Sequence, residues 1–376
     1  MQRLRTRVLD SLAAVDAPDW DALAGDHPLM SHAFLHALHE TGCASRDSGW
    51  SPRYVTLWDD TRLAAAMPMY SKDHSYGEYV FDWAWADAYE RHGMRYYPKL
   101  LSAIPFTPAT GPRLMAATPA LRARLLEAAL TLAREKHASS MHVLFPPQTQ
   151  AQELEAHGML LRTGVQFHWR NPGYRDFDDF LSRFSHDKRK KIKQERRRVQ
   201  EAGVEFAWFD GREAAAAHWD FFFRCYTRTY RQHHSTPYLS RSLFERLALV
   251  IPHNLLLVIG MLEGRPICAA LNIHNAHTLY GRYWGATQFV PGLHFETCYY
   301  QAIEFCIARG IALFEGGAQG EHKLARGFLP ERTYSAHWLA HPQFSNAVED
   351  FLSRETRGIA GYMDELSEHT PYKSAP

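Results

Sequence analysis

The stretch FETCYYQAIEFCIARGIALFEGGAQGEHKLAR, residues 295–326, decides the fold because it joins a helix to a strand and a charged turn. Apolar or aromatic residues at Tyr299, Ile303 and Ile307 recur at helical spacing, and Gly310 is a typical C-cap. Residues 311–314 form an apolar run of strand length, and the nine residues 315–323 that follow contain three glycines and four ionisable groups. Open α/β sheets bind ligands at such strand ends. The alternative is a surface turn with solvated charges.

Composition limits the classes of protein to consider. The chain has 376 residues, of which 46% are hydrophobic and 22% charged, which is typical of a globular protein of two or three domains. A net charge of +1 gives no overall attraction to nucleic acid or membrane. Five cysteines without a CxxC pair favour a reducing compartment. With neither a signal peptide nor an apolar run of about 20 residues, we expect a soluble, cytoplasmic protein without a membrane span.

The order of expected elements repeats along the chain. The first half has a helix, a β-hairpin, a second helix and buried strands; the second half has a helix, a hairpin, a strand, the helix–strand unit above and a last strand. This predicts a mixed α/β fold built by tandem duplication of one unit. The expected domains are residues 1–180, a basic linking helix at 181–202, residues 203–342, and a C-terminal helix and tail at 343–376.

The linking segment Lys188–Arg198 carries eight basic residues in eleven and one Glu. It is either a solvated helix or a surface that contacts RNA phosphates or an anionic substrate through Lys188, Arg189, Lys190 and Lys191. Because the run has no aromatic residues for base stacking, we expect no sequence-specific nucleic-acid binding.

Several common catalytic motifs are missing. The sequence has no GxSxG, HExxH, Walker or GxGxxG pattern. His32, His36 and His39 lie near one face of an expected helix, but their neighbours do not complete a ligand set, so no metal site is predicted.

A family resemblance is carried by six motifs. They are Lys72–Asp82 (KDHSYGEYVFD), Tyr96–Leu100 (YYPKL), Pro105–Pro108 with Gly111–Arg113, Tyr280–Gly285 (YGRYWG), His294–Glu296 and Glu315–Phe328. Together with the repeat and the basic segment, they resemble the FemAB-like acyltransferases of the GNAT superfamily, which carry two GNAT-like domains in tandem. The resemblance runs from about Ala33 to Leu352.

The resemblance implies transfer of an acyl or aminoacyl group to an amine by direct attack. Such an enzyme aligns donor and acceptor, stabilises the oxyanion and removes a proton from the amine. GNAT enzymes hold the pyrophosphate of acyl-CoA on a (Q/R)xxGx(G/A) turn at a helix N-terminus. Here the turn reads GATQFVPGLH, residues 285–294, and Pro291 lacks an amide donor. The donor therefore stays open between acyl-CoA and aminoacyl-tRNA, with no tightly bound cofactor.

The candidate residues follow from this chemistry. Glu315 is the first choice for the catalytic base, unless it is a structural carboxylate bound by loop amides, and His322 is the second choice. Lys323 and Arg326 suit an anionic group or the oxyanion, unless they are solvated loop cations. Alternation along one strand predicts that Tyr280, Arg282 and Trp284 share a face. The other expected substrate contacts are His294, Glu296 and Gln319, with His74, Tyr76, Glu78, Asp82 and Arg113 around an acceptor cleft in the first half.

Two other classes of protein compete with the transferase. A duplicated fold without catalysis would bind an amino acid, peptide or lipid-linked ligand. An RNA-binding protein acting through Lys188–Arg198 would show RNA affinity that falls steeply with salt. The transferase needs an amine-bearing small molecule or peptide as acceptor, and the sequence does not name it.

Overall fold

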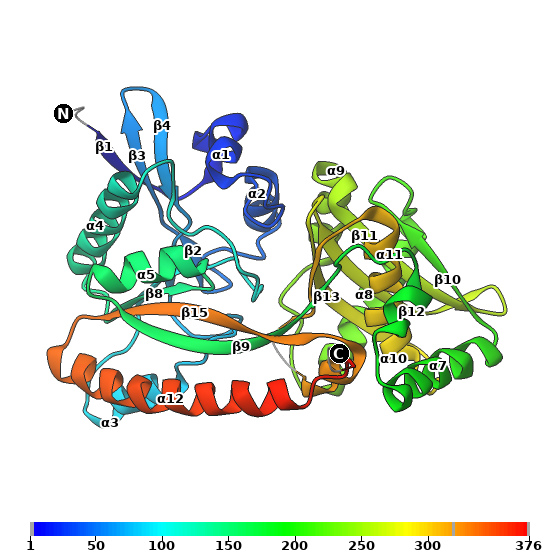
Figure 1. Cartoon of the computed structure of the whole chain (residues 1–376). Coiled ribbons are helices and arrows are strands. Elements are labelled where there is room, and N and C mark those ends of the chain that lie inside the picture. The colour runs from blue at the N-terminus through cyan, green and yellow to red at the C-terminus, as the bar shows by residue number, and fades with distance from the viewer. Residues whose placement is uncertain (1–3, 318–319, 374–376) are drawn as a thin grey trace. The chain divides into compact units, whose positions relative to one another are not determined.

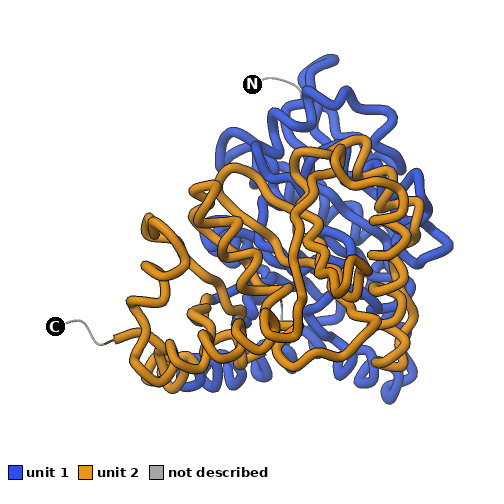
Figure 2. The backbone as a smooth tube through the Cα atoms, turned by 90° about the vertical axis from the view of Figure 1, so that its right-hand side faces the viewer, with its two compact units in different colours: residues 1–165, 332–362 blue, residues 166–331, 363–376 orange. Residues whose placement is uncertain are grey.

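The fold is described from a computed structural model that describes residues 4–317 and 320–373. The chain forms two compact units (Figure 2). Unit 1 comprises residues 1–165 and 332–362, and unit 2 comprises residues 166–331 and 363–376. Strands β9 (Leu160–Arg170) and β15 (Leu329–Leu339) each carry the chain from one unit to the other. The domains predicted from the sequence, bounded at residues 180, 202 and 342, stay a prediction.

Unit 1 contains two groups of paired strands with helices on them (Figure 1). One sheet has the order β1-β3-β4-β7, and the other strands have the order β15-β8-β6-β5-β2. The bounds are β1 Arg5–Leu9, α1 Ala17–Ala24, α2 His32–Glu40, β2 Trp50–Pro52, β3 Tyr54–Asp59, β4 Arg62–Met67, β5 Tyr70–Lys72, α3 Trp83–Arg91, β6 Lys99–Ser102, β7 Met115–Ala116, α4 Pro119–Glu135, β8 Ser140–Leu144, α5 Gln148–Ala156 and, continuing beyond the unit, α12 Pro342–Glu368.

The core of unit 1 forms where α4 packs on β3 and β4. The helix starts at Thr118, whose hydroxyl accepts from the Leu121 amide, and Pro119 occupies the first helical position, where no amide donor is needed. Leu125 and Ala129 on its inner face are fully buried with Val55 and Met67 of the hairpin. This apolar layer fixes the hairpin and the strands that follow it.

Unit 2 contains one run of paired strands in the order β10-β11-β12-β13-β14-β9, in which only β13 and β14 are parallel. Helix α8 packs on β12 and β13. The bounds are α6 Phe177–Ser182, α7 His186–Glu201, β10 Val204–Phe209, α8 Ala216–Gln232, α9 Arg241–Val250, β11 Leu255–Leu262, β12 Arg265–His274, β13 Thr278–Ala286, α10 Leu293–Phe295, a π-helical turn Glu296–Tyr300, α11 Gln301–Arg309, β14 Leu313–Glu315 and a 3₁₀ turn Glu321–Arg326.

The repeated order of elements is present in both units. Each has an antiparallel hairpin, β3–β4 in unit 1 and β11–β12 in unit 2. Each also has one parallel pair joined through a helix: β6 and β8 through α4, and β13 and β14 through the continuous helical segment 293–309. The mixed α/β class predicted from the sequence is confirmed. Within residues 4–317 and 320–373, no helix combines the length and apolarity that a membrane crossing needs.

Candidate active site

The candidate site of unit 2 lies where the parallel strands β13 and β14 stop pairing with each other. The two strands pair in parallel from Thr278 opposite Leu313 to Tyr280 opposite Glu315, where β14 ends. Strand β13 continues to Ala286 with β12 along its other edge. One edge of residues 281–286 therefore lies beyond the end of β14.

A β-bulge in β13 changes which side chains share a face. The register with β12 shifts at this point: Gly281 lies opposite Asn272 and Tyr283 opposite Leu271, which leaves Arg282 as the extra residue. A bulge reverses the alternation of side chains beyond it. The prediction that Tyr280, Arg282 and Trp284 share one face is therefore wrong. Tyr283 takes the face of Tyr280, and its ring contacts Tyr226 of α8.

A pocket of about 480 Å³ lies at the turn between β13 and α10. Its wall contains Trp284, His294 and Phe289, the last of which is 90% exposed. Gly292 has φ of +89° and caps the helix that starts at Leu293, so the first amides of this helix lie at the pocket. The remaining lining residues are Arg228, Thr229, Gln232, His233, Ala286, Thr287, Gln288, Val290, Gly292, Leu293 and Phe295.

Two imidazoles lie close together beside this pocket. The ring of His294 is 4.5 Å from Trp284 and 6.1 Å from His322, centroid to centroid. His322 Nε2 is 3.0 Å from the Tyr299 hydroxyl. Burial lowers the pKa of His294 to about 4, and His322, Arg326 and Lys323 add to that effect. Partial burial, together with Lys323 and Arg326, also lowers the pKa of His322, whose side chain is exposed, and a lowered pKa favours the neutral ring that can accept a proton.

The strand end itself buries two charged side chains. Glu315 and Lys323 are 6% and 2% exposed, so the alternative of solvated turn charges is wrong for them. The Lys323 stem covers Gly316, where an added Cβ would lie 3.3 Å from Cδ and Cε, and Nζ donates to the Gly317 carbonyl at 3.0 Å. Burial lowers the pKa of Lys323 to about 8. Gln319, a predicted substrate contact, lies outside the described residues.

Two residues predicted as substrate contacts, Glu296 and Arg326, form ion pairs with helix α7. Glu296 is buried and accepts both Arg196 Nε at 3.1 Å and Nη2 at 2.9 Å. Arg326 is also buried: Nη2 donates to Glu195 at 2.8 Å and Nη1 to the His322 carbonyl at 2.6 Å. The idea that Arg326 is a solvated loop cation is wrong.

Helix α7 contains the basic run and has two different faces. The inner face buries Ile192 and Val199 beside the ion pairs of Glu195 and Arg196. The outer face forms a groove of about 320 Å³ lined by His186, Arg189, Lys190, Lys193, Gln194 and Arg197. Of the four predicted phosphate contacts, Arg189 and Lys190 line this groove, whereas Lys188 and Lys191 are exposed residues outside its lining.

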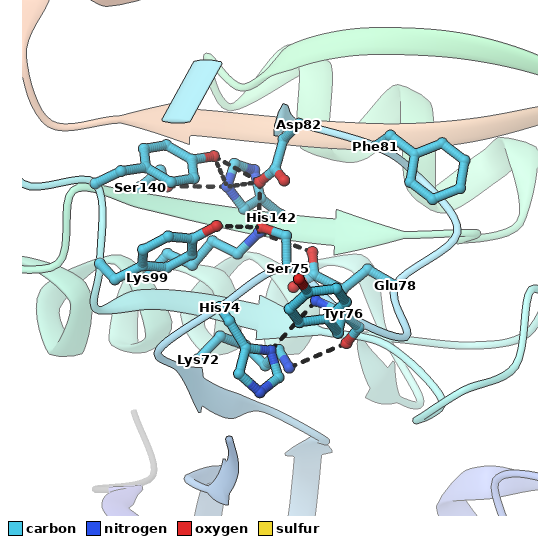
Figure 3. A network of polar contacts seen from close by, with 12 residues as sticks. Lys72, His74, Ser75, Tyr76, Glu78, Phe81, Asp82, Lys99, Ser140 and His142 are labelled. Atoms are coloured by element: carbon cyan, nitrogen blue, oxygen red, sulfur yellow. Dashed lines mark hydrogen bonds and ion pairs between the residues drawn. The ribbon is translucent and has the colours of Figure 1, made fainter. Parts of the chain in front are cut away.

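Unit 1 contains a second polar cluster, shown in Figure 3. Lys99 Nζ donates to Ser75 Oγ at 2.7 Å, to Glu78 Oε2 at 2.8 Å and to Asp82. Burial raises the pKa of Glu78 to about 7, although the positive charge of Lys99 acts to lower it. Burial also favours the neutral acid at Asp82, but Lys99 and His142 outweigh it and hold its pKa at about 2. Glu78 and Asp82, predicted to line an acceptor cleft, are buried together around Lys99, which was not predicted.

The other three residues predicted for the acceptor cleft lie differently. Arg113 is fully buried and donates to the carbonyls of Leu144, Gly111 and Ala109, so it braces loops rather than lining a cleft. Tyr76 is 58% exposed on the loop beyond Lys72. The half-buried ring of His74 lies 5.2 Å from that of Tyr76.

A family model identifies the chain. The model for FemAB-like proteins, described as peptidoglycan biosynthesis/recognition, matches residues 11–374. The chain belongs to the FemAB-like family. This confirms the resemblance stated above and, at the level of class, the prediction of an acyl or aminoacyl transferase.

Solved structures share the fold of this FemAB-like protein. The crystal structure of FemX has a TM-score of 0.56 at 11% identity, covering 89% of this chain and 98% of its own. The C-terminal domain of a putative lysylphosphatidylglycerol synthetase from Agrobacterium fabrum has a TM-score of 0.55 at 9% identity, covering 90% and 96%. The structure of L-PGS from Bacillus licheniformis has a TM-score of 0.52 at 9% identity, covering 84% and 95%. No curated protein matches the sequence. At these identities the likeness shows the fold alone.

Three residues that contact the predicted site residues were missed by sequence reasoning. Lys99 sits in the fully buried strand β6, and a lysine within an apolar strand is a signal for a buried counter-ion. Glu195 is the one acid within the basic run Lys188–Arg198, which is a weaker signal of the same kind. Tyr299 carried no signal, because its helical spacing had marked it as core.

Proposed function

We propose that unit 2 of this FemAB-like protein transfers an acyl or aminoacyl group from an activated donor to an amine by direct attack. The observation that carries the proposal is the parting of β13 and β14 beside a pocket that His294 lines, with His322 next to His294. This arrangement offers a place for the donor carbonyl along the edge of β13, and a group that accepts a proton next to it.

The donor carrier is a phosphate ester of adenosine, a chemistry shared by acyl-CoA and aminoacyl-tRNA. Arg228 supplies positive charge for a phosphate, and the helical segment 293–309 begins at the pocket, where a helix N-terminus favours anions. The exposed Phe289 offers a ring for stacking on a base. Pro291 reduces the number of amides in the turn, which favours one phosphate over a cradled pyrophosphate.

In the reaction, the acceptor amine attacks the carbonyl carbon and the carbonyl oxygen becomes an oxyanion. Backbone N–H groups of β13 beyond Tyr280 stabilise that oxyanion. His322 takes the proton from the amine. The C–S or C–O bond then breaks, and the leaving sulfur or oxygen of the carrier receives a proton from the His322 ring. His322 ranks ahead of Glu315 as the base because its pKa is lowered by partial burial, and because its ring is hydrogen-bonded to Tyr299 and lies next to His294 of the pocket wall. Lys323 holds the strand-end turn through Gly317.

The acceptor is an amine on a cell-wall precursor or lipid, which the description of the family and the name of the similar lysylphosphatidylglycerol synthetase support. The basic groove of α7 is proposed to contact phosphates when the donor is a tRNA. A cytoplasmic location follows from these donors.

The test is the thermal stability of the purified protein with acetyl-CoA, longer acyl-CoAs, free CoA and an aminoacylated tRNA. A donor at about 100 times its Kd adds about 2.7 kcal/mol, a rise of a few degrees in Tm. Arg228→Gln should abolish the rise, whereas Arg224→Gln, on an exposed turn of the same helix outside the pocket lining, should keep it. Donor binding without any product on addition of amines would favour a noncatalytic binding protein and overturn the proposal.

A further inference from the structure

The side chain of Glu195, in the basic helix α7, makes two hydrogen bonds within unit 2. Glu195 Oε1 accepts from Arg326 at 2.8 Å, and Oε2 accepts from the Tyr300 hydroxyl at 2.5 Å. The side chain is 12% exposed and that of Arg326 5%. Glu195, Tyr300 and Arg326, called here the Glu195 clamp, thus join α7 to the π-helical turn and to the 3₁₀ turn that bears His322.

The Glu195 clamp contacts the 3₁₀ turn Glu321–Arg326, which carries His322, the proposed base. Arg326 donates to the His322 carbonyl at 2.6 Å, and its guanidinium lies 3.2 Å from the centroid of Phe295. Phe295 lines the donor pocket, and its ring is 5.9 Å from that of His322. Arg326 is therefore fixed between the pocket wall and the backbone of His322.

The same point of α7 also touches the turn that caps the donor pocket. A Cβ added to Gly292 would lie 3.2 Å from the Glu195 carbonyl and 3.4 Å from the Val199 side chain. Gly292 is the N-cap of α10. The backbone of Glu195 thus lies against Gly292 in the wall of the pocket, while its carboxylate pairs with Arg326 of the 3₁₀ turn.

We propose that Glu195 is a positioning residue of the transfer reaction: through Arg326 it holds the 3₁₀ turn 321–326, and with it His322, at a fixed distance from the donor pocket. Glu195 does not touch donor or acceptor. The role in transfer rests on the proposed function, whereas the clamp itself can be tested without any substrate.

The local test is hydrogen exchange of the full-length protein followed by mass spectrometry. The amides of Lys323 and Gly327 donate to the Gly320 and Leu324 carbonyls at 3.0 Å, and they report on opening of the turn. Glu195→Gln replaces a charge-assisted bond by a weaker neutral one, so these amides should exchange about tenfold faster. Exchange in β10–β12 should stay unchanged. Tyr300→Phe, which leaves the ion pair in place, should give a smaller increase.

A matched control uses the outer face of the same helix. Lys193 pairs with Asp178 at 3.3 Å and is 53% exposed, so Lys193→Gln should leave exchange in the turn unchanged. Unchanged exchange at Lys323 and Gly327 in Glu195→Gln would overturn the clamp, as would an equal increase throughout the protein.

The catalytic arm applies once a donor and an acceptor give product. Glu195→Gln should then lower kcat about tenfold or more while KM stays within about twofold, because misplacement of the base affects the transition state. A loosened turn with unchanged kcat would overturn the positioning role. If no substrate pair gives product, the proposed function fails, and the exchange experiment still decides whether the clamp exists.

Discussion

Lys99 is fully buried and donates to both Glu78 and Asp82, which are themselves 4% and 3% exposed. A buried ion pair contributes little net stability, but removal of one partner leaves an uncompensated charge. The cluster is therefore sensitive to loss of the lysine.

We predict that Lys99→Met lowers the free energy of unfolding by about 3–5 kcal/mol. Glu78 and Asp82 would then be buried without their shared cation. Urea denaturation monitored by circular dichroism measures the change. Lys193→Met is the matched control, because its exposed pair with Asp178 should be worth about 1 kcal/mol or less. A loss below about 1 kcal/mol at Lys99 would contradict the prediction.

Gly285 lies where α8 packs against β13, and we predict that Gly285→Ala is strongly destabilising. An added Cβ would lie 2.2 Å from the Cys225 carbonyl oxygen, which is backbone that cannot swing aside. The expected loss is about 1–3 kcal/mol or more. Gly358→Ala is the control: nothing lies within 4 Å of that Cβ in α12, so a gain of up to about 1 kcal/mol is expected. Thermal unfolding of both variants decides the point.

His322→Gln should lower kcat by about 10²–10⁴ with little change in Tm. The measurement uses the donor that raises Tm and any amine that gives product. Because the pKa of His322 lies below its usual value, kcat/KM should rise with pH through the mildly acidic range and level off near neutrality. Glu321→Gln, an exposed neighbour, is the control. Full activity in His322→Gln together with loss in Glu315→Gln would move the base to Glu315.

Stability should rise with pH between about 4 and 6.5. Burial lowers the pKa of His142 to about 3, and those of His27, His39 and His168 to about 4. In that window the unfolded chain binds more protons than the folded one at these positions, so raising the pH favours the folded state.

Glu78 opposes this trend, because its raised pKa lets the folded state hold an extra proton between about 4.5 and 7. Several histidines outweigh the one carboxyl. Urea midpoints at pH 4.5, 5.5 and 6.5 measure the slope, and His142→Asn should flatten it. A slope of the opposite sign would show that the buried imidazoles are protonated.

The sequence predicted the mixed fold, the repeat and the glycine-rich strand end, because these depend on periodicity and on turn residues within short segments. It did not predict the β-bulge at Arg282, which arises from register between two strands and leaves no mark in alternation. Nor did it separate Arg326 from a solvated cation, since its partner Glu195 is distant in the chain. Short-range patterns thus identified where polar groups gather, and long-range pairing decided which of them face a pocket.

During synthesis on the ribosome, strand β8 is made long before β15, the strand with which it pairs. Leu144 pairs with Ser335, and all of β10 to β14 is made between the two. At about 5–20 residues per second, β8 stays without β15 for roughly 10 to 40 seconds. The strands of unit 2 are complete before those of unit 1 are, so the N-terminal half of the nascent chain is expected to need chaperone protection longer than the half made after it.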